Sequence, residues 1–184
     1  LSLVPISDYN KSKMIAERVL ESYSNKIKIY SVRPATVCGF SKNMRLDISV
    51  NMFVYQALIK KKIYVIGGNQ VRPNIYISDL CRVFIHFLKK NLKPGAYNAG
   101  FENLKIKNLA KKISKKTNCK IIFIKKTNDP RSYRQDSTKL LKTRFKPKFN
   151  VDFAIDELIE KFRKNKIKVT KKLFRVEYMK KFVL

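Results

Sequence analysis

Two side chains near the start of the chain have the types and the spacing needed for acid–base chemistry. Tyr9 and Lys13 lie four residues apart in residues 8–23, where apolar positions recur every three or four residues and predict a helix. Side chains four apart share one helix face. A lysine ammonium beside a phenol favours the phenolate, which can then accept a proton from an alcohol. A lysine-rich chain contains such pairs by chance, so the surrounding sequence must decide.

The surrounding sequence carries five further segments in a recognisable order. They read PISDYNKSK at 5–13, VRPATVCG at 32–39, NMF at 51–53, GGNQVRPNIYISD at 67–79 and YNAG at 97–100. Taken together, these segments resemble the catalytic and substrate-binding segments of the extended short-chain dehydrogenase/reductase superfamily. The resemblance is closest to its NAD-dependent nucleotide-sugar epimerases and dehydratases. MRLD at 44–47 and PRSYRQD at 130–136 resemble a subgroup that makes sugar nucleotides for surface polysaccharides.

The resemblance implies roles for the residues at the reacting end of the site. Tyr9 would be the base or acid at a sugar hydroxyl, and Lys13 would hold the nicotinamide ribose and favour the Tyr9 phenolate. Pro34 and Thr36 would border the nicotinamide pocket of NAD or NADP. Thr36 stands where many family members have asparagine, and Cys38 stands where tyrosine is usual, so these contacts depart from the common pattern.

The resemblance also implies a group of residues that holds the diphosphate of a nucleotide sugar. Asn51 would contact this region, and Arg72 would pair with the phosphate oxygens, for which a guanidinium fork is well shaped. Arg131 or Arg134 would do the same from a later loop. Asp79 is interpreted as a helix cap rather than a substrate ligand.

Two expected features of the family do not occur in the sequence. The five glycines form no glycine-rich fingerprint of the kind that holds a dinucleotide pyrophosphate at a helix N-terminus. The catalytic serine or threonine expected upstream of Tyr9 falls before the first residue. The chain therefore reads as a C-terminal portion with a cut edge, inactive by itself, and the choice among epimerase, dehydratase and reductase stays open.

Strand-like and helix-like segments alternate, which predicts an α/β fold. We expect the C-terminal part of a Rossmann-type doubly wound sheet plus a smaller α/β substrate-binding lobe. The expected division is residues 1–40 for the end of the dinucleotide-binding domain, 41–73 for the substrate lobe, 74–100 for a return to the Rossmann sheet, and 101–184 for the lobe and a basic tail. Expected strands are 27–32, 63–66, 71–77, 96–98 and 120–124, and further helices are 46–59, 80–89, 104–116 and 151–162.

The chain is strongly basic, with a formal net charge of +29. Such a charge can indicate a nucleic-acid-binding domain. However, 32 of the 42 basic residues are lysines, and they are spread along the chain. This pattern favours the explanation that the basic excess reflects the composition of an AT-rich genome. The favoured reading is a portion of a nucleotide-sugar enzyme, homodimeric in its full-length form. A non-catalytic remnant of the same fold and a basic nucleic-acid-binding domain are the alternatives.

The remaining reactive residue types indicate little chemistry. Cys38, Cys81 and Cys119 are odd in number and far apart, which fits small buried side chains in a reducing cytoplasm. His86 is the single histidine, so a site with several histidine ligands is excluded and no metal is expected. No apolar run approaches the length of a membrane-spanning helix, and no membrane partner is expected.

Overall fold

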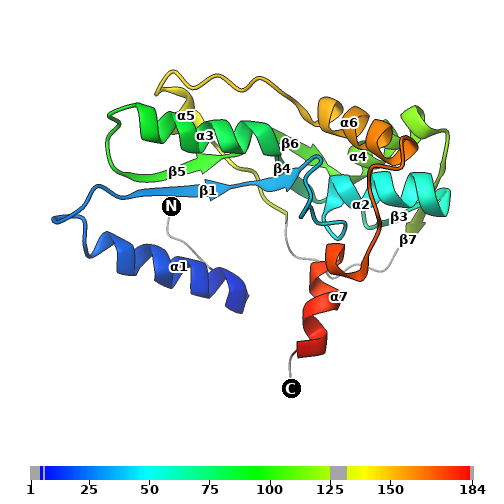
Figure 1. Cartoon of the computed structure of the whole chain (residues 1–184), viewed down its shortest axis with the longest axis horizontal. Helices are drawn as coiled ribbons and strands as arrows, with labels where there is room; N and C mark the ends of the chain where they lie inside the picture. Colours follow the sequence, from blue (N-terminus) through cyan, green and yellow to red (C-terminus); the bar gives the residue numbers. More distant parts are fainter. Residues whose placement is uncertain (1–4, 6, 125–131, 183–184) are drawn as a thin grey trace.

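The computed structural model describes residues 5, 7–124 and 132–182. Helices and strands alternate along most of this part of the chain, as Figure 1 shows, and the α/β prediction is confirmed. The elements are α1 (Asp8–Glu21), β1 (Tyr30–Pro34), β2 (Thr36–Cys38), α2 (Ser49–Tyr55), the π-helix η1 (Gln56–Lys60), β3 (Lys62–Ile66), β4 (Val71–Tyr76), α3 (Ile77–Lys89), β5 (Gly95–Ala99), β6 (Glu102–Lys105), α4 (Ile106–Thr117), β7 (Lys120–Ile124), α5 (Thr138–Leu141), α6 (Val151–Arg163), η2 (Lys171–Leu173), α7 (Arg175–Met179) and η3 (Lys180–Phe182).

The strands form three small groups, most of them parallel. β1 pairs with β5, β2 pairs with β4, and β3 pairs with β7, all in parallel, while β6 runs antiparallel to β4. Residues 30–38 make one nearly continuous extended run that changes partner at Ala35, whose N–H donates to the Ala99 carbonyl at 2.9 Å. Parallel strands joined through helices are the arrangement of a Rossmann-type fold.

Among the described residues, the buried apolar side chains pack into two clusters. The larger one lies where α2 meets α4, α6 and β3, and it contains Leu46, Val54, Ile63, Leu109 and Leu158, each almost fully buried. The smaller one lies between β4, β5 and α3 and also takes in Leu140 and Phe145. The amphipathic patterns of 104–116 and 151–162 are thereby accounted for, since their apolar stripes face the larger cluster.

Several expected elements differ in detail. The helix expected at 46–59 begins at Ser49 and changes to a π-helix at Gln56. The short strands β2 and β6 and the helix α5 have no counterpart among the expected elements. Proline has no N–H for a strand ladder; β4 pairs with β2 only from Asn74 onward, so Pro73 faces no β2 partner.

Asp79 is not the helix cap that the sequence suggested. Tyr76 precedes the first turn of α3, and Asp79 lies inside that turn with no exposed surface. Its carboxylate accepts the N–H groups of Lys148 and Phe149 at 2.9–3.1 Å and a bond from Arg82. Asp79 therefore fastens the start of α3 to the segment that leads into α6.

The three cysteines have different surroundings. Cys38 is buried, as expected, and desolvation raises the pKa of its thiol to about 12, so it is held in the neutral form. Cys119 is half-buried, and Cys81 is exposed on α3, against expectation. His86 pairs with the Thr143 hydroxyl at 2.8 Å, which ties α3 to the residues after α5.

Candidate active site

Helix α1 carries Tyr9 and Lys13 on one exposed face, as the four-residue spacing predicts. Ser7 caps the helix, its hydroxyl accepting the Asn10 N–H at 3.2 Å. The Lys13 ammonium lies 5.4 Å from the centre of the Tyr9 ring, within the range of a cation–π contact. Tyr9 is 70% exposed. The phenol is therefore accessible to another molecule and has a cation beside it.

An ion pair fixes α1 beside the end of β1. The Arg33 guanidinium donates from Nε to Glu17 Oε2 at 3.0 Å, and a second, shorter bond joins Nη2 to Oε1. This two-pronged bond to Glu17 raises the pKa of Arg33, against the opposing effect of partial burial. Pro34 and Thr36 follow Arg33 closely, so the ion pair places the Tyr9 helix and the residues expected at the nicotinamide pocket in one region.

Residues 132–137, here called the crossing segment, connect three strands. The Ser132 hydroxyl accepts the Val71 N–H of β4 at 3.1 Å. Gln135 and Asn103 of β6 exchange two hydrogen bonds, at 2.9 and 3.1 Å. Gln135 Nε2 also donates to the Arg33 carbonyl of β1 at 2.8 Å. The crossing segment thus links the strand that carries Arg72 to the strand that holds α1.

Arg72 and the crossing segment lie together. Arg72 is half-buried on β4, and its guanidinium carbon is 5.8 Å from the centre of the Tyr133 ring. Arg134 is the next residue and is exposed. Arg72 and the segment that carries Arg134 therefore lie in one region, while Arg131 lies outside the described residues. A basic group beside an exposed loop suits an anion.

The buried side chain of Asn51 forms hydrogen bonds to backbone groups. Its Nδ2 donates to the Arg45 carbonyl at 2.9 Å, and its Oδ1 accepts the Gly39 N–H at 3.1 Å. These bonds hold the loop after β2 against α2. The expected contact with a diphosphate stays a prediction, and it would require one of these bonds to be exchanged.

Two glycines shape the surroundings for steric reasons. Gly39 has φ +110°, and a Cβ there would lie 2.6 Å from Tyr76 Cε2. A Cβ on Gly100 would lie 2.3 Å from Gln135 Oε1 and 2.6 Å from the Ala35 Cβ. The space beside Gly100 therefore lets the Gln135 side chain reach Arg33. Ser137 supports this arrangement by exchanging hydrogen bonds with the Gly100 N–H and carbonyl at 2.9 and 2.8 Å.

Sequence reasoning did not assign roles to Glu17, Arg33, Gln135 or Gly100. Glu17, Arg33 and Gly100 stood inside or next to the matched segments, but their partners are distant in sequence and no local pattern shows them. A hollow of roughly 290 Å³ borders the crossing segment, and a second of roughly 310 Å³ borders the start of β5. Neither Tyr9 nor Arg72 lines either hollow. Within the described residues, no group of three His, Cys, Asp or Glu could hold a metal ion.

Known structures share this arrangement of strands and helices. UDP-N-acetylglucosamine 4-epimerase from Methanobrevibacter ruminantium superposes with a TM-score of 0.78 at 20% identity, over 89% of this chain and 56% of that one. UDP-glucuronic acid 4-epimerase from Bacillus cereus gives 0.77 at 22% identity, over 90% and 55%. TunA, an NAD-dependent NDP-hexosamine 5,6-dehydratase of tunicamycin biosynthesis, gives 0.77 at 20% identity, over 88% and 55%. The fold is accordingly that of the Rossmann-type epimerases, and the chain spans little more than half of their length.

The sequence model of the NAD dependent epimerase/dehydratase family matches residues 1–100. This range includes Tyr9, Lys13, Asn51 and Arg72 and covers more than half of the chain. The chain therefore belongs to the NAD dependent epimerase/dehydratase family, and the resemblance to that family drawn from the sequence is confirmed.

Proposed function

We propose that this chain forms the C-terminal part of a nucleotide-sugar epimerase or dehydratase in which Tyr9 handles the proton of a sugar hydroxyl. The observation that carries the proposal is the exposed Tyr9–Lys13 pair on α1, fixed by Glu17 and Arg33 beside the end of β1. Structures with the same fold bear the names of enzymes that act on UDP sugars and NDP-hexosamines.

The proposed chemistry divides between this chain and a cofactor. NAD or NADP, when bound, supplies the acceptor and donor of hydride at the sugar carbon. Tyr9 takes the hydroxyl proton during the oxidation and can return one in the reverse sense, which is general acid–base catalysis. Lys13, whose ammonium lies beside the Tyr9 ring, offers N–H donors to a ribose. Pro34 and Thr36 form the neighbouring wall.

The residues present fit the nicotinamide end of the cofactor better than its pyrophosphate. Lys13 is a donor on an open helix face, as a ribose contact requires. By contrast, none of the glycines lies in a tight turn between a strand and the first turn of a helix, where a pyrophosphate is bound. We therefore assign the pyrophosphate to the part of the family fold that this chain does not span. On this proposal, 1–40 and 74–100 belong to the dinucleotide-binding domain, and 41–73 and 101–184 to the substrate lobe.

At the other end, Arg72 and Arg134 are proposed to bind the diphosphate of the sugar nucleotide, with Arg131 and Asn51 as further candidates. Guanidinium groups bind phosphate oxygens through paired charge-assisted bonds. The shared position of Arg72 and the crossing segment supports this assignment. A cytoplasmic, homodimeric enzyme that supplies sugars for surface polysaccharides is the context that we propose.

The decisive test is the Tyr9→Phe substitution, measured in the longest natural polypeptide that contains this chain. The substitution keeps the ring and removes the titrating hydroxyl, so we expect kcat to fall at least about 10²–10⁴-fold while substrate binding is retained. Tyr23→Phe, just past the end of the same helix, is the matched control and should leave kcat unchanged. Turnover of the Tyr9 variant within a few-fold of the parent would remove Tyr9 from the mechanism. A parent without turnover on any nucleotide sugar would favour the non-catalytic alternative.

A second measurement addresses the diphosphate group. A charge-assisted hydrogen bond contributes about 1.5–3 kcal/mol, so Arg72→Ala should raise the KM for the nucleotide sugar by roughly 10–150-fold. Arg163→Ala removes an exposed arginine elsewhere and should leave KM unchanged. Equal effects of the two variants would contradict the assignment of Arg72.

A further inference from the structure

The C-terminal part of the described chain, residues 166–182, is here called the tail segment and is strongly basic. It contains Glu177 as its one acidic residue and seven basic residues, which are Lys166, Lys168, Lys171, Lys172, Arg175, Lys180 and Lys181. Basic clusters of this density on a short amphipathic segment attract anionic surfaces.

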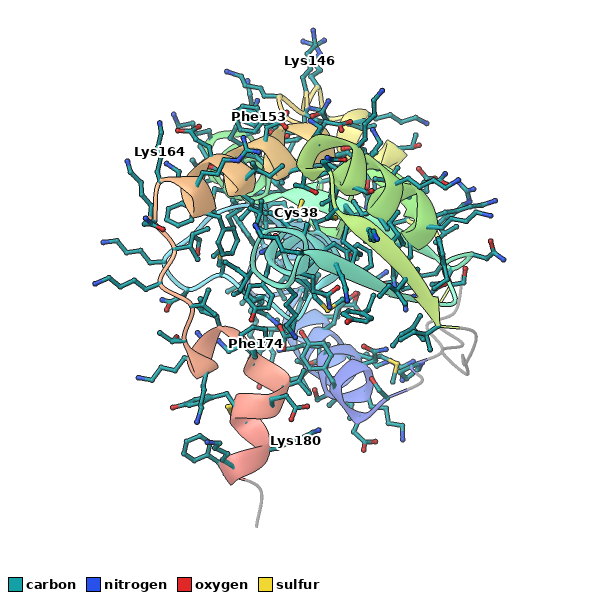
Figure 2. All side chains as sticks on the ribbon, turned by 90° about the vertical axis from the view of Figure 1, so that its right-hand side faces the viewer. Cys38, Lys146, Phe153, Lys164, Phe174 and Lys180 are labelled. Atoms are coloured by element: carbon teal, nitrogen blue, oxygen red, sulfur yellow. The ribbon has the colours of Figure 1, made fainter. Side chains whose placement is uncertain are left out.

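The middle of the tail segment is fixed to the body of the protein. The Leu46 N–H donates to the Leu173 carbonyl at 2.7 Å, and the Val176 N–H donates to Asp47 Oδ2 at 2.8 Å. The rings of Phe174 and Tyr55 meet edge to face with centres 5.3 Å apart. From this anchor, α7 and η3 project away from the body, as both Figure 1 and Figure 2 show.

The projecting part exposes an apolar stripe. Val176 is 53% exposed, Met179 54% and Phe182 65%, and their three-residue spacing places them on one side of the helical turns. Lys180 and Lys181 are exposed beside the stripe, and Figure 2 shows Lys180 at the projecting end. An exposed apolar stripe with a basic border is the pattern of a segment that lies in a membrane interface.

We propose that the tail segment binds the surface of an anionic lipid bilayer, with Val176, Met179 and Phe182 inserted among the acyl chains and the lysines on the headgroups. The charge complementarity selects an anionic surface, and the apolar stripe selects lipid over nucleic acid, because a nucleic-acid backbone offers no apolar phase for a methionine and a phenylalanine. None of the described helices has the length and apolarity to cross a bilayer, so the contact is peripheral. The sequence analysis expected no membrane partner, and this proposal revises that expectation.

The proposal goes beyond the proposed function and does not depend on it. The chain has no tryptophan, so Phe182→Trp introduces a single indole fluorophore at the tip of the stripe. Vesicles of phosphatidylglycerol and phosphatidylcholine in equal parts should shift its emission to the blue. Vesicles of phosphatidylcholine alone should not, and added salt should reverse the shift because it screens the headgroup attraction. Heparin, a soluble polyanion, should leave the emission unshifted.

Matched variants of the full chain separate the two contributions in a vesicle co-sedimentation assay. Met179→Ser with Phe182→Ser should weaken binding to the anionic vesicles about tenfold or more. Lys180→Gln with Lys181→Gln should weaken it about 25-fold, since each basic residue near the surface contributes about fivefold. Two control variants remove exposed groups at the end of α3. Leu88→Ser is the control for the apolar pair, and the double variant Lys89→Gln with Lys90→Gln is the control for the lysine pair. Both should bind the vesicles as the parent does.

Three outcomes would overturn the proposal. The first is an unshifted indole emission from the Phe182→Trp variant with anionic vesicles. The second is equal loss of vesicle binding in the α3 controls, which would reduce the effect to net charge. The third is that the Met179 and Phe182 double variant changes the monomer–dimer equilibrium in sedimentation and leaves vesicle binding intact, which would make the stripe a contact between copies of the chain.

Discussion

Helices α1 and α6 are similar in length, yet their environments are opposite. Six residues of α6 are buried, and Leu158 has no exposed surface. None of the residues of α1 is buried, and Val19 in its apolar stripe is 54% exposed. The part of the chain around α6 is therefore stabilised by a core of its own, whereas, among the described residues, α1 with the proposed catalytic pair is placed by an ion pair and its chain connection to β1. Within the described residues, the larger core and the proposed catalytic pair lie in different parts of the chain.

The largest expected stability effect tests this difference directly. Leu158→Ala in α6 should lower the free energy of unfolding by about 2–5 kcal/mol, through lost burial and the cavity left behind. Val19→Ala in α1 should change it by less than about 0.5 kcal/mol, since an exposed side chain leaves no cavity. Urea denaturation followed by circular dichroism measures both. Similar losses for the two variants would mean that α1 is packed in solution.

A smaller loss in the free energy of unfolding is expected for Gly100→Ala. The added Cβ meets Gln135 Oε1 and the Ala35 Cβ at distances that require a shift, and such overpacking costs about 1–3 kcal/mol. We also expect the crossing segment to lose its bond from Gln135 to Arg33, which hydrogen exchange at residues 132–137 would detect. Gly95→Ala, where a Cβ meets only the Lys139 Nζ at 3.5 Å but φ is +124°, separates backbone strain from overpacking.

Glu17→Gln should have a local effect. The substitution weakens the two-pronged bond to Arg33, and partly exposed ion pairs contribute at most about 1 kcal/mol. Amide exchange in α1 should accelerate while exchange in α6 is unchanged. Glu21→Gln, one turn further along the same helix, removes a charge that acts on Arg33 through space, so it isolates the contribution of the two-pronged bond from Glu17. Faster exchange in both helices would contradict the separation of the two regions.

The smallest effect is expected from the pH dependence of Glu102. Burial raises the pKa of this carboxyl, although it accepts the Val151 N–H. An acid with a raised folded-state pKa favours folding while protonated, and this contribution is lost as pH rises from the unfolded value of about 4.3 through the folded value. Glu102→Gln should flatten this part of the stability profile. Urea midpoints compared across that pH range provide the measurement, and parallel profiles for the two proteins would contradict it.

The sequence predicted the longer elements well and the short ones poorly. Residues 104–116 and 151–162 have strong periodicity, and α4 and α6 begin and end within about two residues of the expectation. β2, β6 and α5 have three or four residues, too few for a period to show. Asp79 was misassigned because an acidic residue at a helix start has the same local signature whether it caps the helix or binds Lys148 and Phe149.

The same limit applies to the site. The closeness of Tyr9 and Lys13 to each other follows from their spacing on a helix, which is a local property of the sequence. The bonds from Arg33 to Glu17 and from Gln135 to Arg33 join residues far apart in the chain, and a single sequence contains no signal for them. The buried bonds of Asn51 are likewise a property of the folded loop rather than of the NMF segment.

The extended run of residues 30–38 fixes a distance between two parts of the fold. Arg33 is paired with the helix of Tyr9, and Gly39, just past the end of the run, is held by Asn51. An extended backbone rises about 3.3 Å per residue, so these two points are kept about 20 Å apart. Parallel pairing with β5 and then β4 prevents that length from changing. The distance between the helix of Tyr9, proposed to handle the proton, and the loop held by Asn51, proposed to lie near the phosphates, is therefore set by the number of residues in this run. A one-residue insertion here would alter that distance, whereas the same insertion in a surface loop would not.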